Sequence, residues 1–290
     1  MRAVLELLAL FIAAQVVGLV VANAFIVGGV SEQVSLGRFS LEDLFFMIIG
    51  FAFTVLLVLA LVRFYKGDFL YRIMEFIIIT AATFVVFYGV GWYFGFEDNA
   101  LVLAVALSVL KLVVPAVKNV AATLSSVGVA VMFAMLLSFW EAVFFLVLMS
   151  VYDYVAVFIT RHMITLASEF GRRNMSFSIS SQEKVKMPVV VREHGERVVK
   201  TEEREERLEL GTGDIALPLM FNIIVFREVA QVSAGAAISA FIVIGVFSAM
   251  ALGVVLAYVK KRKLFLPALP PLLLGTLLGY MLAYVSGIIV

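Results

Sequence analysis

The chain has 290 residues, of which 63% are hydrophobic and only 15% are charged. Ordinary soluble domains carry about 25% charged residues, so this composition excludes a soluble globular protein and indicates an integral membrane protein. The 22 basic and 21 acidic residues nearly cancel, and we expect no nucleic-acid partner. Without cysteine, and with two histidines that both lie outside the apolar runs, the chain is expected to hold no metal and no cofactor.

Nine apolar runs follow one another along the chain, and a membrane-spanning helix needs about 20 mostly apolar residues. We therefore expect an all-α integral membrane protein with nine transmembrane helices, with eight as the alternative because the gaps near Pro115 and Trp140 are short. The first run also has features of a signal peptide, but it is longer than the apolar core typical of one. The nine runs are residues 3–27, 43–63, 72–95, 100–117, 121–139, 141–160, 210–226, 231–259 and 266–290.

The basic residues indicate how these helices are oriented. If the N-terminus is cytoplasmic, the cytoplasmic connections hold all of the 22 basic residues except Arg38 and Arg227. Cytoplasmic loops of membrane proteins are enriched in Lys and Arg. We therefore predict a multi-pass protein of the cell membrane, with a cytoplasmic N-terminus and an extracytoplasmic C-terminus.

One long polar connection divides the chain into three parts. We expect a six-helix part at residues 1–160, a cytoplasmic loop at 161–208 and a three-helix part at 209–290. Within the loop, valine-rich segments flank His194 and Gly195, which suggests a short β-hairpin. The charged run KTEEREER (200–207) is instead typical of a solvated segment, and for residues 170–200 we favour a solvated, irregular conformation.

Two apolar runs each contain one aspartate. Asp153 lies in LMSVYDYVAVFIT (148–160) and Asp214 in LELGTGDIALPLMF (208–221). A charge in the bilayer costs roughly 2.5–3.5 kcal/mol on insertion scales, so each carboxylate is expected to serve a function. Asp153 precedes Arg161, and Asp214 follows Arg207, by about 10–12 Å of helix at 1.5 Å per residue. The two carboxylates are therefore expected at similar depth in the cytoplasmic half of the membrane, within reach of each other.

Two neighbouring carboxylates cannot both ionise easily and are expected to hold one proton between them. Such a pair supplies the base and the acid that peptide hydrolysis requires. Gly211 and Gly213 each lower helix propensity by roughly 1 kcal/mol and allow unwound backbone beside a water-filled cavity. The residues alone leave two alternatives open: a cation or proton channel or transporter that uses the same aspartates, and a scaffold that binds membrane helices.

Three motifs resemble those of one known family. SVYDYVAVF (150–158) resembles the Tyr-Asp motif of the sixth membrane helix of presenilins, and LGTGD (210–214) resembles the G-x-G-D motif of their seventh. LPALPP (266–271) resembles the Pro-Ala-Leu motif that opens their ninth helix. The motifs stand in the same order, on the sixth, seventh and ninth predicted helices. The sequence thus resembles the presenilin-type intramembrane aspartyl proteases, with the closest likeness to a single-chain microbial homologue.

The resemblance implies an aspartic endopeptidase that cleaves transmembrane segments of membrane proteins. It implies single-span membrane proteins as substrates, membrane lipids as surroundings and no obligatory accessory subunit, while a homo-oligomer is left open. Signal peptide peptidases share these motifs in the opposite orientation and form an alternative that the charge distribution disfavours. The residues implied are Asp153 and Asp214 as the catalytic pair, Tyr152, Gly211 and Gly213 around them, and Pro267, Ala268 and Leu269 packed beside them.

Other residues give more local expectations. The segment Leu208, Glu209 and Leu210, just ahead of the catalytic glycines, is expected to pair with an unwound substrate as an added strand. Glu75, Lys111 and Glu141 lie near predicted helix ends, where snorkelling to the membrane surface explains a charge. Gln15 and Asn23 are expected to form hydrogen bonds between helices.

Overall fold

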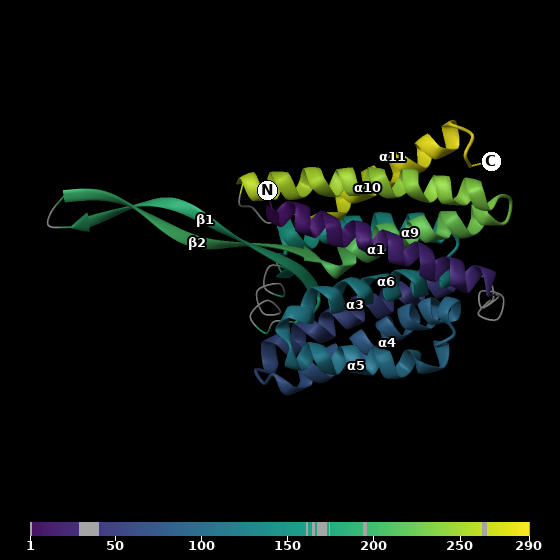
Figure 1. The fold of residues 1–290 in the computed structure, drawn as a ribbon, viewed down its shortest axis with the longest axis horizontal. Coiled ribbons are helices and arrows are strands. Elements are labelled where there is room, and N and C mark those ends of the chain that lie inside the picture. Colours follow the sequence, from purple (N-terminus) through teal and green to yellow (C-terminus); the bar gives the residue numbers. More distant parts are fainter. Residues whose placement is uncertain are drawn as a thin grey trace.

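A computed structural model describes residues 2–28, 41–160, 162–163, 166, 173, 175–193, 196–262 and 266–289. Over these residues the chain forms nine α-helices, gathered in one bundle, and a single two-stranded sheet that projects beyond the helices at one end (Figure 1). Each predicted apolar run coincides with one of these helices, so the helical prediction is confirmed. The helices are α1 Arg2–Val27, α3 Leu41–Phe64, α4 Phe69–Phe94, α5 Ala100–Val113, α6 Lys118–Leu136, α7 Phe139–Tyr154, α9 Thr212–Ala230, α10 Ala234–Arg262 and α11 Leu269–Val285.

Several helices have the length and composition of membrane spans. In the part of the chain that is described, five are long and apolar enough to cross a bilayer. Large apolar side chains such as Phe53, Leu56 and Val254 are exposed on the outside of the bundle, where lipid would cover them. The prediction of a helical membrane protein is therefore confirmed. The five helices are Arg2–Val27, Phe69–Phe94, Pro115–Leu136, Phe139–Ile159 and Ala234–Arg262.

Helix α9 is the centre of the bundle. Every residue from 215 to 226 is buried, so the helix is covered on all sides rather than on one face. A helix that is apolar all round is expected in such a position. Its neighbours are α1, α6, α7, α10 and α11. The carboxylate at its start, Asp214, is thereby fixed to the most enclosed element of the fold.

Close helix crossings depend on glycine. A Cβ atom added at Gly128 of α6 would lie 1.8 Å from the carbonyl oxygen of Ala82 in α4. A Cβ atom added at Gly279 of α11 would lie 2.8 Å from the Cα atom of Ile244 in α10. Small residues at such crossings let helix backbones approach closely, and dispersion contacts then hold the helices together in lipid.

The connection between α7 and α9 is a long β-hairpin. Strand β1 (Ser178–Glu193) pairs antiparallel with β2 (Glu196–Gly211), in one register from Ser178↔Gly211 to Glu193↔Glu196. At about 3.3 Å per residue, each strand is about 50 Å long. The hairpin was expected to be short, and the irregular conformation favoured for residues 170–200 is wrong for the described residues 178–193 and 196–200. The strands pair through backbone hydrogen bonds, which do not depend on the charge of the side chains. A run of charged residues therefore could not predict this pairing.

The turn proposed at His194 and Gly195 lies outside the described residues. The hairpin makes the fold not purely α-helical, since a sheet accompanies the predicted helices.

Two charges predicted at the membrane surface are buried instead. Glu75 of α4 and Lys111 of α5 are 2% and 6% exposed and form an ion pair, so the snorkelling prediction is wrong for both. Both charges are buried because α4 packs along α5, which places Glu75 and Lys111 against each other. Glu141 has a different role, since it completes a capping box with Ser138 at the start of α7.

The predicted hydrogen bonds between helices are confirmed. Gln15 of α1 accepts a hydrogen bond from the side-chain amide of Asn222 in α9, at 3.1 Å. The Asn222 amide also donates to the carbonyl oxygen of Phe241 in α10, at 3.0 Å. Asn23 of α1 donates to the hydroxyl of Tyr93 in α4. Polar side chains thus join α1 to α9 and to α4, and α9 to α10.

Candidate active site

Asp153 lies at the end of α7, where the helix changes its geometry. Residues Val155–Ile159 continue α7 as a π-helical turn, a feature that is frequent at functional sites. The Asp153 side chain is 8% exposed. Its Oδ2 atom accepts a hydrogen bond of 3.2 Å from the backbone N–H of Leu269. The carboxylate is therefore enclosed and held by a backbone donor from a distant part of the chain.

Asp214 lies in the first turn of α9, directly after the hairpin. Gly211 ends β2 with extended backbone, and Thr212 begins the helix. The backbone N–H of Thr212 donates to the carbonyl of Phe177 at 3.1 Å, which fixes the point where strand becomes helix. Helix α7 packs against α9, and Asp214 is close enough to Asp153 for their charges to interact. The structure thus brings the two predicted carboxylates together.

The two glycines of the G-x-G-D motif have different surroundings. A Cβ atom added at Gly211 would lie 3.2 Å from Oδ2 of Asp214, tighter than ordinary van der Waals contact. At Gly213, which is exposed, an added Cβ atom would meet no heavy atom within 4 Å. The unwound backbone expected from both glycines occurs at Gly211 alone, because Gly213 is already helical.

The Pro-Ala-Leu segment forms the N-terminus of α11, against Asp153. Pro267, Ala268 and Leu269 are all buried. Leu269 is the first residue of the helix, and the N–H groups of a first helical turn have no partner within the helix. The Leu269 N–H finds its acceptor in the Asp153 carboxylate. This contact joins α11 to α7 at the site.

Tyr152 is half-buried, and its side chain contacts His162 and helix α3. Its hydroxyl is 2.9 Å from Nε2 of His162, and its ring meets the edge of Phe51 in α3 at a centroid distance of 5.2 Å. Burial lowers the pKa of His162 from its usual value. No role was predicted for His162, because it lies outside the apolar run that contains Asp153. Tyr152 and His162 meet because the chain bends after α7.

Pro218 is a second residue whose position was overlooked. It lies inside α9, four residues after Asp214. Proline has no N–H, so the backbone carbonyl of Asp214 lacks its usual helical donor. The four-residue spacing is visible in the sequence and is the signal that could have shown this loosened first turn.

The residues expected to bind a substrate strand are part of the hairpin. Leu208, Glu209 and Leu210 pair with Ser181, Ser180 and Ile179 of β1. Leu210 is 3% exposed and belongs to the core. A substrate strand would therefore extend an existing two-stranded sheet, along the side of β2 opposite to β1.

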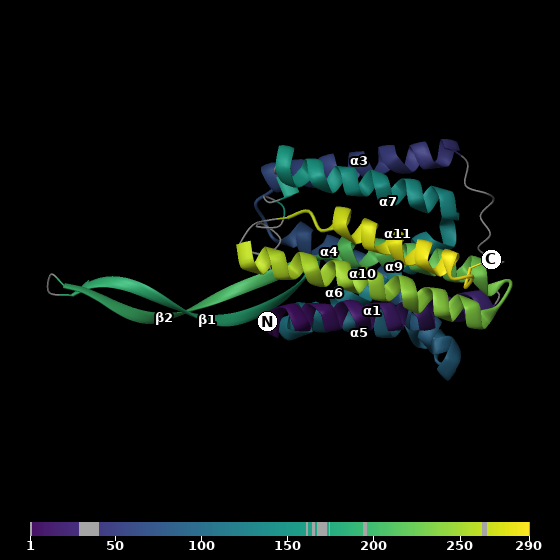
Figure 2. The same cartoon turned by 90° about the horizontal axis from the view of Figure 1, so that it is seen from above.

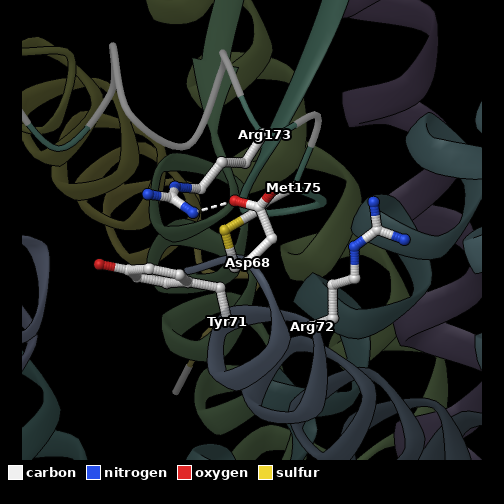
Figure 3. Close-up of a pocket in the computed structure, with 5 residues that line it drawn as sticks. All are labelled: Asp68, Tyr71, Arg72, Arg173 and Met175. Atoms are coloured by element: carbon white, nitrogen blue, oxygen red, sulfur yellow. Dashed lines mark hydrogen bonds and ion pairs between the residues drawn. The ribbon is translucent and has the colours of Figure 1, made fainter. Parts of the chain in front are cut away.

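A small cavity of about 170 Å³ lies at the start of α4 and is lined by Asp68, Tyr71, Arg72, Arg173 and Met175 (Figure 3). The Arg173 guanidinium lies 4.2 Å from the centre of the Tyr71 ring and forms an ion pair with Asp68. It also donates to the carbonyl oxygen of Gly67 at 3.0 Å. These contacts hold the segment ahead of β1 against α4. Among the described residues, no three His, Asp or Glu side chains are grouped to hold a metal ion.

Comparison with known proteins agrees with these features. The sequence model of the family described as "Signal-peptide peptidase, presenilin aspartyl protease" matches residues 8–289. A solved structure described as "Structure of a presenilin family intramembrane aspartate protease in C222 space group" matches with a TM-score of 0.59. The match covers 96% of this chain and 95% of that one at 21% sequence identity, and it shows a shared fold. No curated relative is similar enough in sequence to match.

Proposed function

The chain belongs to the signal-peptide peptidase and presenilin aspartyl protease family and is a membrane-embedded aspartic hydrolase, and from that premise we propose that Asp153 and Asp214 are its catalytic pair. The proposal rests above all on one observation. Helix α7 packs against α9, and the charge of Asp153 acts on the carboxyl group of Asp214, while the N–H of Leu269 holds Asp153. The bond hydrolysed is a peptide bond within a transmembrane segment of a membrane protein.

The pair acts as base and acid on one water molecule. The ionised carboxylate takes a proton from water as the water oxygen bonds to the peptide carbonyl carbon, and the protonated carboxyl gives its proton to the carbonyl oxygen. When the tetrahedral intermediate collapses, the C–N bond breaks, a hydroxyl proton of the intermediate passes to a carboxylate, and the leaving nitrogen takes a proton from the other carboxyl. One water is consumed, and the pair ends with the single proton that it held at the start.

The neighbouring residues hold this pair in place. The Leu269 N–H orients Asp153, and the absence of a side chain at Gly211 leaves space for the Asp214 carboxyl. Tyr152 precedes Asp153 and contacts α3. We assign Gly213, Pro267 and Ala268 to the walls of the same site, because they flank the two aspartates in sequence or in space.

We further propose that the chain crosses the cell membrane nine times, with its N-terminus and hairpin in the cytoplasm. The N-terminus lies at the end of the bundle from which the hairpin projects, and the C-terminus lies at the opposite end (Figures 1 and 2). A chain that crosses the membrane an odd number of times has its two termini on opposite sides, which agrees with these positions. The basic end of α10, Lys260 to Arg262, lies at the hairpin end as well, in accord with the enrichment of basic residues in cytoplasm. In this proposed arrangement the six-helix part is residues 1–160, the cytoplasmic loop is residues 161–208 and the three-helix part is residues 209–290.

The substrates we propose are single-span membrane proteins that unwind near the site. A helical peptide bond is shielded by its own hydrogen bonds, whereas an extended segment can add to the edge of a sheet. The stretch Leu208–Leu210 is part of the strand that would receive it, directly ahead of Asp214. Backbone pairing recognises no particular side chain, so broad specificity follows. The chain carries both aspartates itself, so we propose activity without an accessory subunit.

The experiment is cleavage of a single-span substrate by the purified protein in detergent. Wild type is compared with Asp153→Asn and Asp214→Asn, each with and without a transition-state inhibitor of aspartyl proteases. We expect cleavage by wild type alone, and its complete block by the inhibitor. Substrates tagged at either end, in liposomes of known sidedness, separate this orientation from the opposite one of signal peptide peptidases. A wild type that cleaves none of several substrates but carries ions across liposomes would overturn the proposal.

A further inference from the structure

Asn119, near the start of α6, is bonded to the backbone of β1 at two points. Its side-chain amide donates to the carbonyl oxygen of Ser180 at 2.8 Å, and its Oδ1 atom accepts from the Ser180 N–H at 3.0 Å. One side-chain amide therefore engages both backbone groups of one strand residue. A neighbouring strand would make the same two hydrogen bonds.

These two bonds show which way the backbone of β1 faces. In an antiparallel pair, successive residues point their N–H and C=O groups alternately toward the partner strand and away from it. Because Ser180 uses both groups on Asn119, it points away from β2, and Ile179 and Ser181 point toward it. Pro188 has the same parity as Ser180, and a proline is tolerated in a strand where no ladder hydrogen bond is required. Asn119 therefore lies on the outer edge of β1.

Other contacts hold the same strand to the helices. The backbone N–H of Ser176, just ahead of β1, donates to the Glu75 carboxylate of α4 at 2.5 Å. Ser181 donates to Glu6 of α1, and Glu183 forms an ion pair with Lys260 of α10. Four helices thus contact β1 and the residues before it. Strand β2 lies on the other side of the ladder and continues into α9.

We propose that Asn119 is a positioning residue that closes the outer edge of β1, so that an extended substrate can add only along β2. The inference rests on the proposed function and adds to it a reason why the substrate meets the correct edge. A two-stranded sheet has two edges, and either one is a template for another strand. Strand β2 leads directly into Asp214, whereas a peptide on β1 would lie three strand spacings, about 14 Å, from one on β2.

Removing the Asn119 amide should therefore create a second and unproductive binding edge. In Asn119→Ala, a synthetic single-span peptide should bind with a stoichiometry one higher than before. Ser180→Pro added to this variant should restore the original stoichiometry, because proline blocks an edge by removing its donor. Ser126→Ala is the matched control, since Ser126 is a buried polar residue of α6 that bonds to its own helix at Ala122.

The binding measurement uses the inactive Asp214→Asn protein in detergent and does not depend on cleavage. Its outcome therefore differs from that of the proposed function: a peptide that binds only after Asn119→Ala supports the closed edge even if wild type cleaves nothing. In the active protein, a peptide on β1 occupies a separate edge and leaves β2 open to productive binding. The value of kcat/KM should therefore stay at that of wild type in Asn119→Ala and in Asn119→Ala/Ser180→Pro.

Two results would overturn the inference. An unchanged stoichiometry in Asn119→Ala would show that the edge is closed by something else. A loss of kcat/KM together with a lower melting temperature, not rescued by Ser180→Pro, would show that Asn119 only supports the fold.

Discussion

The backbone N–H of Leu269 donates to the carboxylate of Asp153 over 3.2 Å, although 116 residues separate them in the chain. The contact fixes where this carboxylate lies. Asp153→Glu keeps the charge but moves the oxygen atoms by one methylene group. A misplacement of about 1 Å can cost about 100-fold in rate, and we expect a loss of that size in kcat. An Asp153→Glu protein with wild-type kcat would show that the position held by Leu269 is unimportant.

The two glycines of the G-x-G-D motif should respond differently to alanine. In Gly211→Ala the new Cβ atom would press on Oδ2 of Asp214, so kcat should fall about 10- to 100-fold through misplacement of the carboxyl group. Gly213→Ala serves as the control, because its Cβ atom would enter open space. Its effect should be confined to KM. Kinetics of both variants on one substrate give the comparison, and equal losses of kcat would contradict it.

Removal of one partner of the buried ion pair between Glu75 and Lys111 should lower the stability of the folded protein. Glu75→Leu leaves Lys111 buried without its carboxylate, which should lower the free energy of unfolding by about 3–5 kcal/mol. The double variant Glu75→Leu/Lys111→Met replaces the pair by apolar side chains and should recover most of that loss. Thermal unfolding of the three proteins in the same detergent measures this. A double variant as unstable as Glu75→Leu would refute the pairing argument.

Proline at neighbouring positions of β2 should separate substrate pairing from hairpin stability. The backbone groups of Ser180 face away from β2, and this direction alternates along the ladder. The backbone N–H and C=O of Leu208 therefore face Ser181, and those of Arg207 face away from β1. Leu208→Pro therefore removes a hydrogen bond of the hairpin and should lower its stability by about 1 kcal/mol or more. Arg207→Pro should leave the hairpin intact but cut the cleavage rate. If Arg207→Pro cleaves at the wild-type rate, the substrate does not pair with β2 there.

The ion pair of Glu183 and Lys260 ties β1 to the basic C-terminal end of α10. The hydrogen bond from Lys260 lowers the pKa of Glu183 from 4.5 to about 2. A group with a lowered pKa stabilises the folded protein above its unfolded pKa and loses this effect as the pH falls through its folded pKa. Wild type should therefore be more stable than Glu183→Gln above pH 4.5, with the difference shrinking from there to pH 2. A difference in melting temperature that is independent of pH would contradict this.

The helices and the family motifs could be predicted from the sequence because both depend on local signals. Apolar runs of bilayer length are continuous in the sequence, and each one became a helix. A carboxylate within such a run is conspicuous, since it is costly in lipid. Counting residues to the nearest arginine predicted a similar depth for Asp153 and Asp214. In the structure α7 packs against α9, and the charge of Asp153 acts on Asp214.

The contacts that support these residues could not be predicted, because each depends on packing. Glu75 and Lys111 look like residues at helix ends until α4 and α5 are placed side by side. Asn119 gave no signal as a partner of Ser180, 61 residues away. The full length of strand β2 was not predicted, because its many charged residues are typical of a solvated segment and its pairing with β1 uses only backbone groups.

We propose that Asp153 and Asp214 act as one unit, and the rate of the double variant tests this most directly. Cleavage of one substrate is measured in single turnover for Asp153→Asn, Asp214→Asn and the two changes combined. Groups that work together are non-additive, so each single change should cost about 10⁴-fold or more and the second should cost nothing further. A single variant that keeps a tenth of the activity, or a double variant whose loss is the product of the single losses, would contradict the account.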